Sequence, residues 1–273
     1  MDNFNIKRFA HTFRWYFCEN RSRLLAWSAG LALGIFVAQS FFLWIAVGQI
    51  KGLQLTPEIT SSVCGPITGI CVLLTLWFVF SQIFSTLKTK QKRTTYLTLP
   101  ATNLERYLAA FLMTAVVWLI FILLAVALGD TLRMVFFGLL GKGWVSGVVA
   151  YLSRGSNQLT GWAAFMDNAL DLSTWFWVLS FYILCGTLLS KREFLLGSLA
   201  QIVIIVAYIW VYYKFNFQYS MLMNIDEATG VTHVNLLMYV AVLGLLALSI
   251  LNIWGSYQLF KRFQIITSKW FNV

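Results

Sequence analysis

The 273-residue sequence predicts an all-α polytopic membrane protein with six transmembrane helices. Its composition is 59% hydrophobic and only 11% charged, whereas soluble domains carry about 25% charged residues. The mean hydropathy is +0.75. Apolar runs long enough to cross a hydrocarbon core about 30 Å thick recur along the chain. The basic residues, which give a net charge of +10, gather at the ends of these runs.

Residues 1–23 are expected to form an amphipathic helix that lies flat on the inner leaflet. Phe9, Phe13, Tyr16 and Phe17 recur at the spacing of one helix face, and the basic side chains lie largely elsewhere. An aromatic face and a cationic face together suit the headgroup region. A disordered start is the alternative, which the six aromatic residues between positions 4 and 17 disfavour. The segment is too long and charged for a cleavable signal.

The rest of the chain, 24–273, is expected to be one six-span transmembrane domain. The spans are predicted at about 24–50, 63–87, 108–128, 172–189, 194–213 and 234–257. Pro66 suits the first turn of the second span, where the missing amide has no helical partner. The third span should hold no ionisable residue and end at Gly129–Asp130.

The segment 130–171 is expected to be helical structure on the outer side rather than a seventh span. A seventh span would place Arg133 and Lys142 inside the bilayer and would reverse the side of every later loop. With six spans, only five of the 20 Lys and Arg residues fall outside. These are Lys51, Arg133, Lys142, Arg154 and Lys214. The excess of the other 15 on the inner side predicts that both termini are cytoplasmic.

The polar loop between the second and third spans, 88–108, predicts two short structured pieces. Its first part is basic, with Lys88, Lys90, Lys92 and Arg93, which fixes it as cytoplasmic. Pro100 ends any helix that arrives from upstream. Thr102 stands three residues before Glu105, which is the spacing of a capping box at a helix start. A simple solvated connector is the alternative reading.

The sequence lacks the motifs of several common kinds of catalytic and metal-binding site. There is no P-loop and no His-Glu-x-x-His, and the four cysteines form no Cys-x-x-Cys pair. The chain is therefore expected to have no catalytic, cofactor-binding or metal site of its own, and not to be an enzyme. Its basic residues follow the membrane topology, so no nucleic-acid partner is expected.

The stretch LTLPATNLERYL, 97–108, is similar to the L-x-LP-[AV]-[ST]-x-x-E-[KR]-[YF] segment of small permeases of the type-2 ABC exporter family, many of them bacterial. The predicted order of elements also resembles that family over the whole chain. It comprises an N-terminal amphipathic helix, six spans and a cytoplasmic helix between spans two and three. Many such permeases have re-entrant outer helices between spans five and six, whereas here the longer outer segment lies between spans three and four.

The resemblance implies a multi-pass permease subunit of the bacterial cytoplasmic (inner) membrane. A separate ABC ATPase subunit, which binds ATP and Mg²⁺, would dock on the 88–108 loop, and a second permease copy would complete a homodimer or a related heterodimer. Closure of the ATPase can move membrane helices only through a rigid contact, here a coupling helix. The expected coupling residues are Tyr96, Leu97 and Leu99 as packing contacts, Pro100 as the hinge, and Thr102 with Glu105 as the cap. The N-terminal helix would brace the same interface.

The many aromatic residues of the spans fit export of an amphipathic or lipid-like substrate. Most of these rings are explained, however, by packing and by the usual enrichment of aromatic residues at the membrane interfaces. Two alternatives remain open. One is a non-transporting structural, immunity or assembly protein of the membrane. The other is a membrane enzyme that acts on lipid at the outer face through Asp167, Asp171 or His233.

Overall fold

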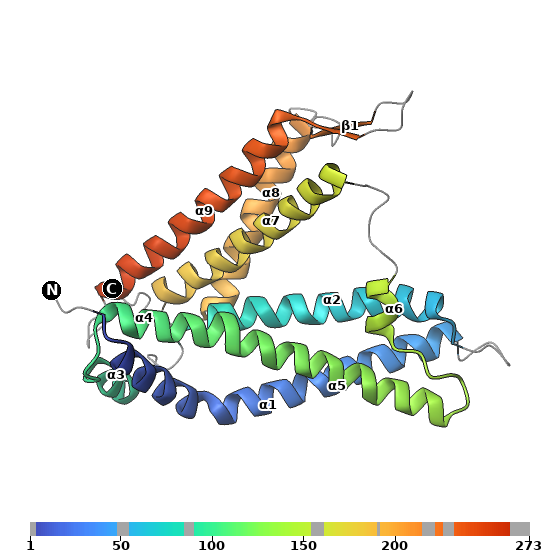
Figure 1. The fold of residues 1–273 in the computed structure, drawn as a ribbon, viewed down its shortest axis with the longest axis horizontal. Coiled ribbons are helices and arrows are strands. Elements are labelled where there is room, and N and C mark those ends of the chain that lie inside the picture. The colour runs from blue at the N-terminus through green and yellow to red at the C-terminus, as the bar shows by residue number, and fades with distance from the viewer. Residues whose placement is uncertain are drawn as a thin grey trace. The chain divides into compact units, whose positions relative to one another are not determined.

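The computed structural model describes residues 4–47, 55–84, 90–153, 161–189, 192–214, 222–225 and 232–262. Within these residues the chain is almost entirely helical (Figure 1). Six helical stretches are long and apolar enough to cross a membrane, as the sequence predicts. They are Ile6–Ala46, Pro57–Ser81, Asn103–Leu139, Gly161–Leu188, Glu193–Trp210 and Leu236–Lys261. The chain divides into two compact units, which are described separately.

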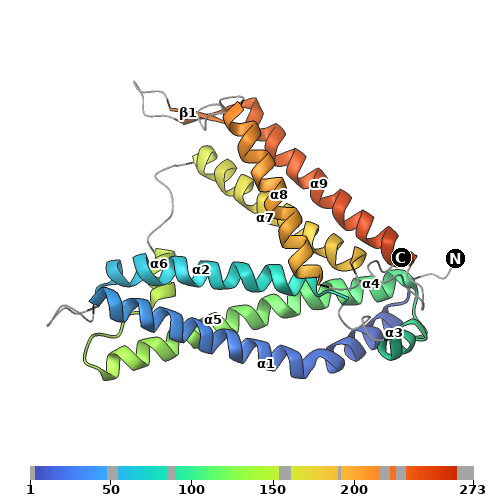
Figure 2. The same cartoon turned by 180° about the vertical axis from the view of Figure 1, so that it is seen from behind.

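Unit 1 comprises residues 1–79 and 104–156. Its elements are α1 (Ile6–Val47), most of α2 (Pro57–Ser81), α4 (Asn103–Leu112), the π-helical turn η2 (Met113–Val117), α5 (Trp118–Leu139) and the short α6 (Gly147–Ser153). Helices α1 and α5 lie side by side (Figures 1 and 2), and Ile35, Ile122 and Val126 form a buried cluster between them. Gly129 permits their close approach, because a Cβ at that position would stand 2.8 Å from the backbone oxygen of Ala32.

Unit 2 comprises residues 80–103 and 157–273. Its elements are α3 (Lys90–Leu97), α7 (Gly161–Leu188), α8 (Glu193–Lys214), β1 (Met223–Ile225), β2 (Thr232–Val234) and α9 (Leu236–Lys261). Helix α7 packs against both α8 and α9. The two strands form an antiparallel pair, and they lie between α8 and α9 along the chain. Met166 of α7, Met223 of β1 and Met238 of α9 form a buried cluster.

The N-terminal segment and the first span form one helix. Residues 6–23 continue into the span without a break, so α1 has 42 residues and a length of about 63 Å, roughly twice the hydrocarbon thickness. Its direction changes along its length (Figure 1). Helix α1 is therefore longer than one bilayer crossing requires. That its N-terminal part lies on the inner leaflet stays a prediction.

The third span does not end at Gly129–Asp130. Helix α5 continues to Leu139, because Gly129 serves close packing against α1 rather than termination, and because the charged side chains that follow are paired. In its described residues, 130–153 and 161–171, the predicted outer segment holds the end of α5, the seven-residue α6 and the start of α7. Helix α6 is far too short to span a bilayer, which agrees with the rejection of a seventh span.

Candidate functional site

Two helices occupy the polar loop between the second and third spans. Helix α3 ends at Leu97 and α4 begins at Asn103, with a turn between them. In this turn the Leu99 N–H donates to the Tyr96 carbonyl at 3.4 Å, and the Ala101 N–H donates to the Leu99 carbonyl at 2.8 Å. The predicted helix break around Pro100 and the restart after it are confirmed.

Glu105 joins the start of α4 to the start of α1. Its carboxylate is fully buried, and Oε1 accepts hydrogen bonds from the Asn5 backbone N–H at 2.7 Å and from the Arg8 guanidinium at 3.0 Å. Asn5 precedes the first turn of α1, and its own Oδ1 accepts the Lys7 N–H at 2.9 Å. The negative carboxylate thus lies at the positive end of the α1 dipole, where an anion is favoured.

The position of Glu105 also fits the predicted capping box. Thr102 directly precedes the first residue of α4, and Glu105 is the third residue of that helix. The capping hydrogen bonds themselves stay a prediction. The contact with Asn5 and Arg8, about a hundred positions away, is not foreseen by the sequence, because a capping box reports only local pairing.

Tyr96 connects α3 to the end of α9 within unit 2. Its side chain is fully buried, and its ring lies edge-on to Phe260 with the ring centroids 6.4 Å apart. The ring of Phe84 also stacks on that of Phe260, with the ring centroids 5.0 Å apart. Tilted and offset aromatic pairs of this kind are favourable beyond their burial. Tyr96 is therefore a packing contact inside the chain.

The other predicted coupling residues differ in exposure. Pro100 is exposed and Leu99 is half-buried, whereas the side chain of Leu97 lies outside the described part of the structure. The same holds for the side chains of Lys90, Lys92 and Arg93, and for Lys88 entirely. The side chains that α3 and the following turn present to the surface include those of Gln91, Thr94, Thr95 and Thr98.

The four aromatic residues that are predicted to share one face of the N-terminal segment differ in burial. Tyr16 is buried, Phe9 and Phe13 are half-buried and stack at 6.3 Å, and Phe17 is exposed. The buried side chains recur instead every four residues, at Thr12, Tyr16, Asn20 and Leu24. This stripe is largely polar, so a search for an apolar face does not find it.

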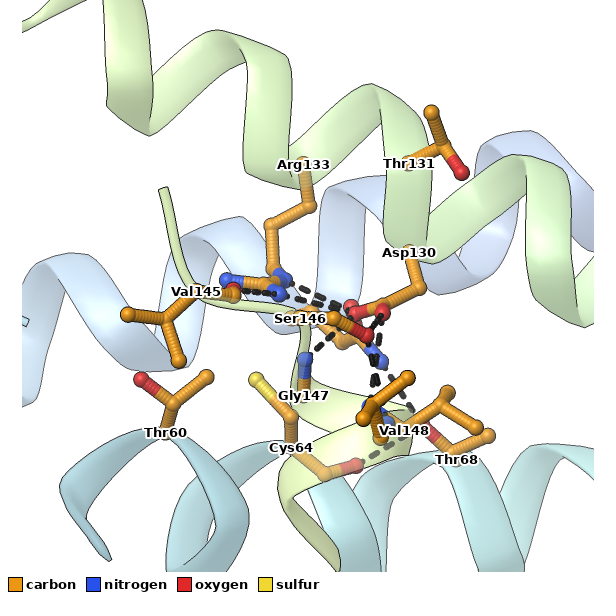
Figure 3. Close-up of polar contacts among 12 residues, drawn as sticks. Thr60, Cys64, Thr68, Asp130, Thr131, Arg133, Val145, Ser146, Gly147 and Val148 are labelled. Atoms are coloured by element: carbon orange, nitrogen blue, oxygen red, sulfur yellow. Dashed lines mark hydrogen bonds and ion pairs between the residues drawn. The ribbon is translucent and has the colours of Figure 1, made fainter. Parts of the chain in front are cut away.

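A buried ionic cluster in unit 1 escapes the sequence analysis. Asp130 and Arg133 of α5 are one helical turn apart and buried, with Arg133 Nη2 and Nε donating to Asp130 Oδ1 at 2.8 and 3.2 Å. Arg133 Nη2 also donates to the Val145 carbonyl at 2.7 Å. Figure 3 shows both side chains turned toward the start of α6.

Asp130 also binds the first residues of α6 (Figure 3). Its carboxylate accepts hydrogen bonds from the Ser146 hydroxyl at 2.6 Å and from the backbone N–H groups of Gly147 and Val148 at 3.1 and 3.3 Å. These amides have no partner within a helix, so the carboxylate satisfies them and fixes α6 against α5. Five donors share the two oxygens, which leaves the carboxylate a structural group rather than a reactive one.

Glycines bring α6 close to α2. A Cβ at Gly147 would stand 2.7 Å from Cys64 Cβ, and a Cβ at Gly65 would collide with the ring of Tyr151. Nearby, Gln39 of α1 donates to the Thr68 hydroxyl of α2 at 2.7 Å.

One sequence signal could have revealed the ionic cluster of Asp130 and Arg133. It is a pair of opposite charges at i and i+3 within a run that is apolar on both sides.

The three residues of the alternative enzymatic site lie on α7 and β2 of unit 2. Asp167 is half-buried and Asp171 exposed on α7, and His233 is exposed on β2. Within the described parts of the chain, no three His, Cys, Asp or Glu side chains are placed to hold a metal ion.

Comparisons with protein-family models, with curated proteins and with solved structures yield no match to this chain.

Proposed function

We propose that the chain is the membrane-spanning permease subunit of an ATP-driven ABC exporter, and that a separate ATPase subunit docks on the 88–108 loop. The observation that supports this best is the way the loop is held. On its α3 side, Tyr96 packs against Phe260 of α9, and on its α4 side, Glu105 binds Asn5 and Arg8 of α1. A displacement of this loop would act on helices of both units.

The physical requirement for such a device is stiffness. An ATPase outside the membrane moves spans only if the contact element does not absorb the displacement. Each of the two short helices of this loop has a buried attachment to a longer helix of its own unit, α3 to α9 through Tyr96 and α4 to α1 through Glu105. The sequence resemblance to type-2 ABC exporter permeases covers residues 97–108, which lie in the same loop. Two permease copies with two ATPase subunits follow from the resemblance.

The buried charges favour an external energy source. Proton- and ion-coupled carriers commonly place an ionisable side chain inside the membrane, where it takes up and releases the coupling ion. The Asp130 oxygens instead accept five hydrogen bonds from donors of the same chain. An amphipathic or lipid-like substrate is consistent with the aromatic surface of the spans.

Co-purification from native membranes tests the proposal. The tagged chain, extracted in mild detergent, should retain an ATPase that carries a P-loop, identified by mass spectrometry. Single cysteines at Thr94 and Thr98, introduced after replacement of the four native cysteines, should cross-link to this ATPase, whereas a cysteine at the exposed Trp254 of α9 should not. A chain that retains no ATPase under these conditions contradicts the proposal.

A further inference from the structure

An open groove lies between α1 and α2 in unit 1. Its volume is about 390 Å³. The residues that line it are Ala26, Trp27, Gly30, Leu31 and Thr75. The Trp27 ring stacks on Phe78 of α2 with the centroids 4.7 Å apart, so an aromatic pair borders the groove. Its lining is mainly apolar or small, which suits a hydrocarbon chain.

Gly30 keeps the groove open. A Cβ built on Gly30 meets no atom within 4 Å, so a side chain at this position would occupy the groove instead of colliding with the protein. The contrast with Gly147 and Gly65 of the same unit is direct, because a Cβ at either position would strike a neighbouring side chain. A Cβ at Gly34 or Gly69 of this unit also meets no atom within 4 Å, but neither residue lines the groove, so it is at Gly30 that a side chain would enter it.

The basic residues of α1 indicate that the ligand of this groove is anionic. The helical segment that leads to the groove exposes Lys7, Arg14, Arg21 and Arg23 against one exposed acid, Glu19. Arg23, Trp27 and Gly30 recur at i, i+4 and i+7, so the guanidinium and the groove share one face of α1. Arg23 precedes Gly30 by about 10 Å along the helix axis. A phosphate beside Arg23 would therefore have its acyl chain running toward the groove.

We infer that the groove between α1 and α2 binds one acyl chain of an anionic phospholipid, with the lipid phosphate held at Arg23. Both helices are long and apolar enough to cross the bilayer, so lipid is the solvent of this surface. A Trp ring at the start of the apolar stretch suits the level of the headgroups. The lipid belongs to the leaflet at the basic end of α1. The inference does not rest on the proposed transport function.

Lipid binding to the purified full-length chain tests the inference. The protein is delipidated in detergent and titrated with phosphatidylglycerol or phosphatidylcholine, and bound lipid is counted by native mass spectrometry. We expect the native sequence to hold phosphatidylglycerol in preference to phosphatidylcholine. Gly30→Leu should abolish this bound lipid and Gly30→Ala should weaken it. Arg23→Gln should lower the preference for the anionic lipid about fivefold, the effect of one basic residue near a charged surface.

Gly244→Leu in α9 is the matched control, because a Cβ there also meets no atom within 4 Å and the position is outside the groove. It should bind lipid as the native sequence does. Retention of phosphatidylglycerol by Gly30→Leu, or equal binding of the two lipids by the native sequence, would overturn the inference. So would a Gly30→Leu variant that changes only the oligomeric state, since the groove would then be a contact between two copies of the chain.

Discussion

The buried carboxylate of Glu105 accepts a hydrogen bond from the guanidinium of Arg8 at 3.0 Å, across 97 positions of the sequence. The same oxygen binds the Asn5 backbone N–H at 2.7 Å. Glu105→Ala removes the acceptor for both donors. Because Arg8 is 38% exposed and can turn to water, we expect a loss of about 1–3 kcal/mol in the free energy of unfolding. Glu105→Gln, which keeps one acceptor oxygen, should lose less.

Thermal unfolding in detergent measures this loss, and Arg8→Ala provides the second arm of a double-mutant cycle. Because the two side chains interact directly, the double variant should be more stable than the sum of the two single losses implies. Additive losses would mean that Glu105 and Arg8 stabilise the protein independently.

The ionic cluster of α5 should respond more strongly than the Glu105 contact, because both of its charges are buried. Arg133→Met leaves Asp130 without its cation, and Asp130→Ala leaves Arg133 without its anion. Removal of one partner of a buried pair costs about 3–5 kcal/mol of stability, whereas an apolar replacement of both partners costs less than the sum. Unfolding midpoints of the two single variants and the double variant check this expectation.

The double variant also separates two roles of Asp130. If its only role is to neutralise Arg133, the double variant should recover most of the stability. If the capping of α6 also matters, the double variant should remain less stable than the native sequence, because the Gly147 and Val148 amides lose their acceptor. Proteolysis within α6 that rises in the double variant would show the second role directly.

Gly65 should tolerate no side chain, although it lies in a helix where alanine is normally favoured. A Cβ at Gly65 would collide with the Tyr151 ring, so Gly65→Ala should destabilise by about 1–3 kcal/mol, the usual cost of overpacking. Gly69→Ala, one turn later in α2 with no atom within 4 Å of its Cβ, should stabilise by about 0.5–1 kcal/mol. Tyr151→Ala should relieve the Gly65→Ala defect in the double variant. Thermal unfolding of these four variants beside the native sequence tests all of these expectations.

Composition and apolar run length predict the number of spans, because each bilayer crossing imposes the same length on the chain. Helix ends are predicted less well. The Gly129–Asp130 pair has the composition of a helix end, yet α5 continues through it. The reason is tertiary: Gly129 faces the Ala32 backbone oxygen, and the Asp130 charge is satisfied by Arg133 and by α6. Neither partner is visible in the local sequence.

For the candidate site too, the sequence predicts the local structure but not the contacts between distant segments. The helix break around Pro100 follows from the fixed geometry of proline and its missing N–H, so the sequence alone predicts it. The contacts of Tyr96 with Phe260 and of Glu105 with Asn5 join segments about a hundred or more positions apart. No spacing rule predicts such contacts. They decide which side of each helix is buried, and hence which residues are left for a partner.

Pro100→Ala distinguishes the permease from a non-transporting membrane protein. Pro100 is exposed and lies in the turn between α3 and α4, so its replacement should change the unfolding midpoint little. It removes the constraint that keeps the two helices separate, because alanine allows α3 to extend. In proteoliposomes that contain the Pro100→Ala chain and the ATPase proposed to dock on it, ATP hydrolysis by the ATPase should continue while substrate export falls. Thr95→Ala, an exposed replacement within α3, should leave both rates unchanged. Export by Pro100→Ala at the native rate would mean that the turn does not transmit the motion of the ATPase.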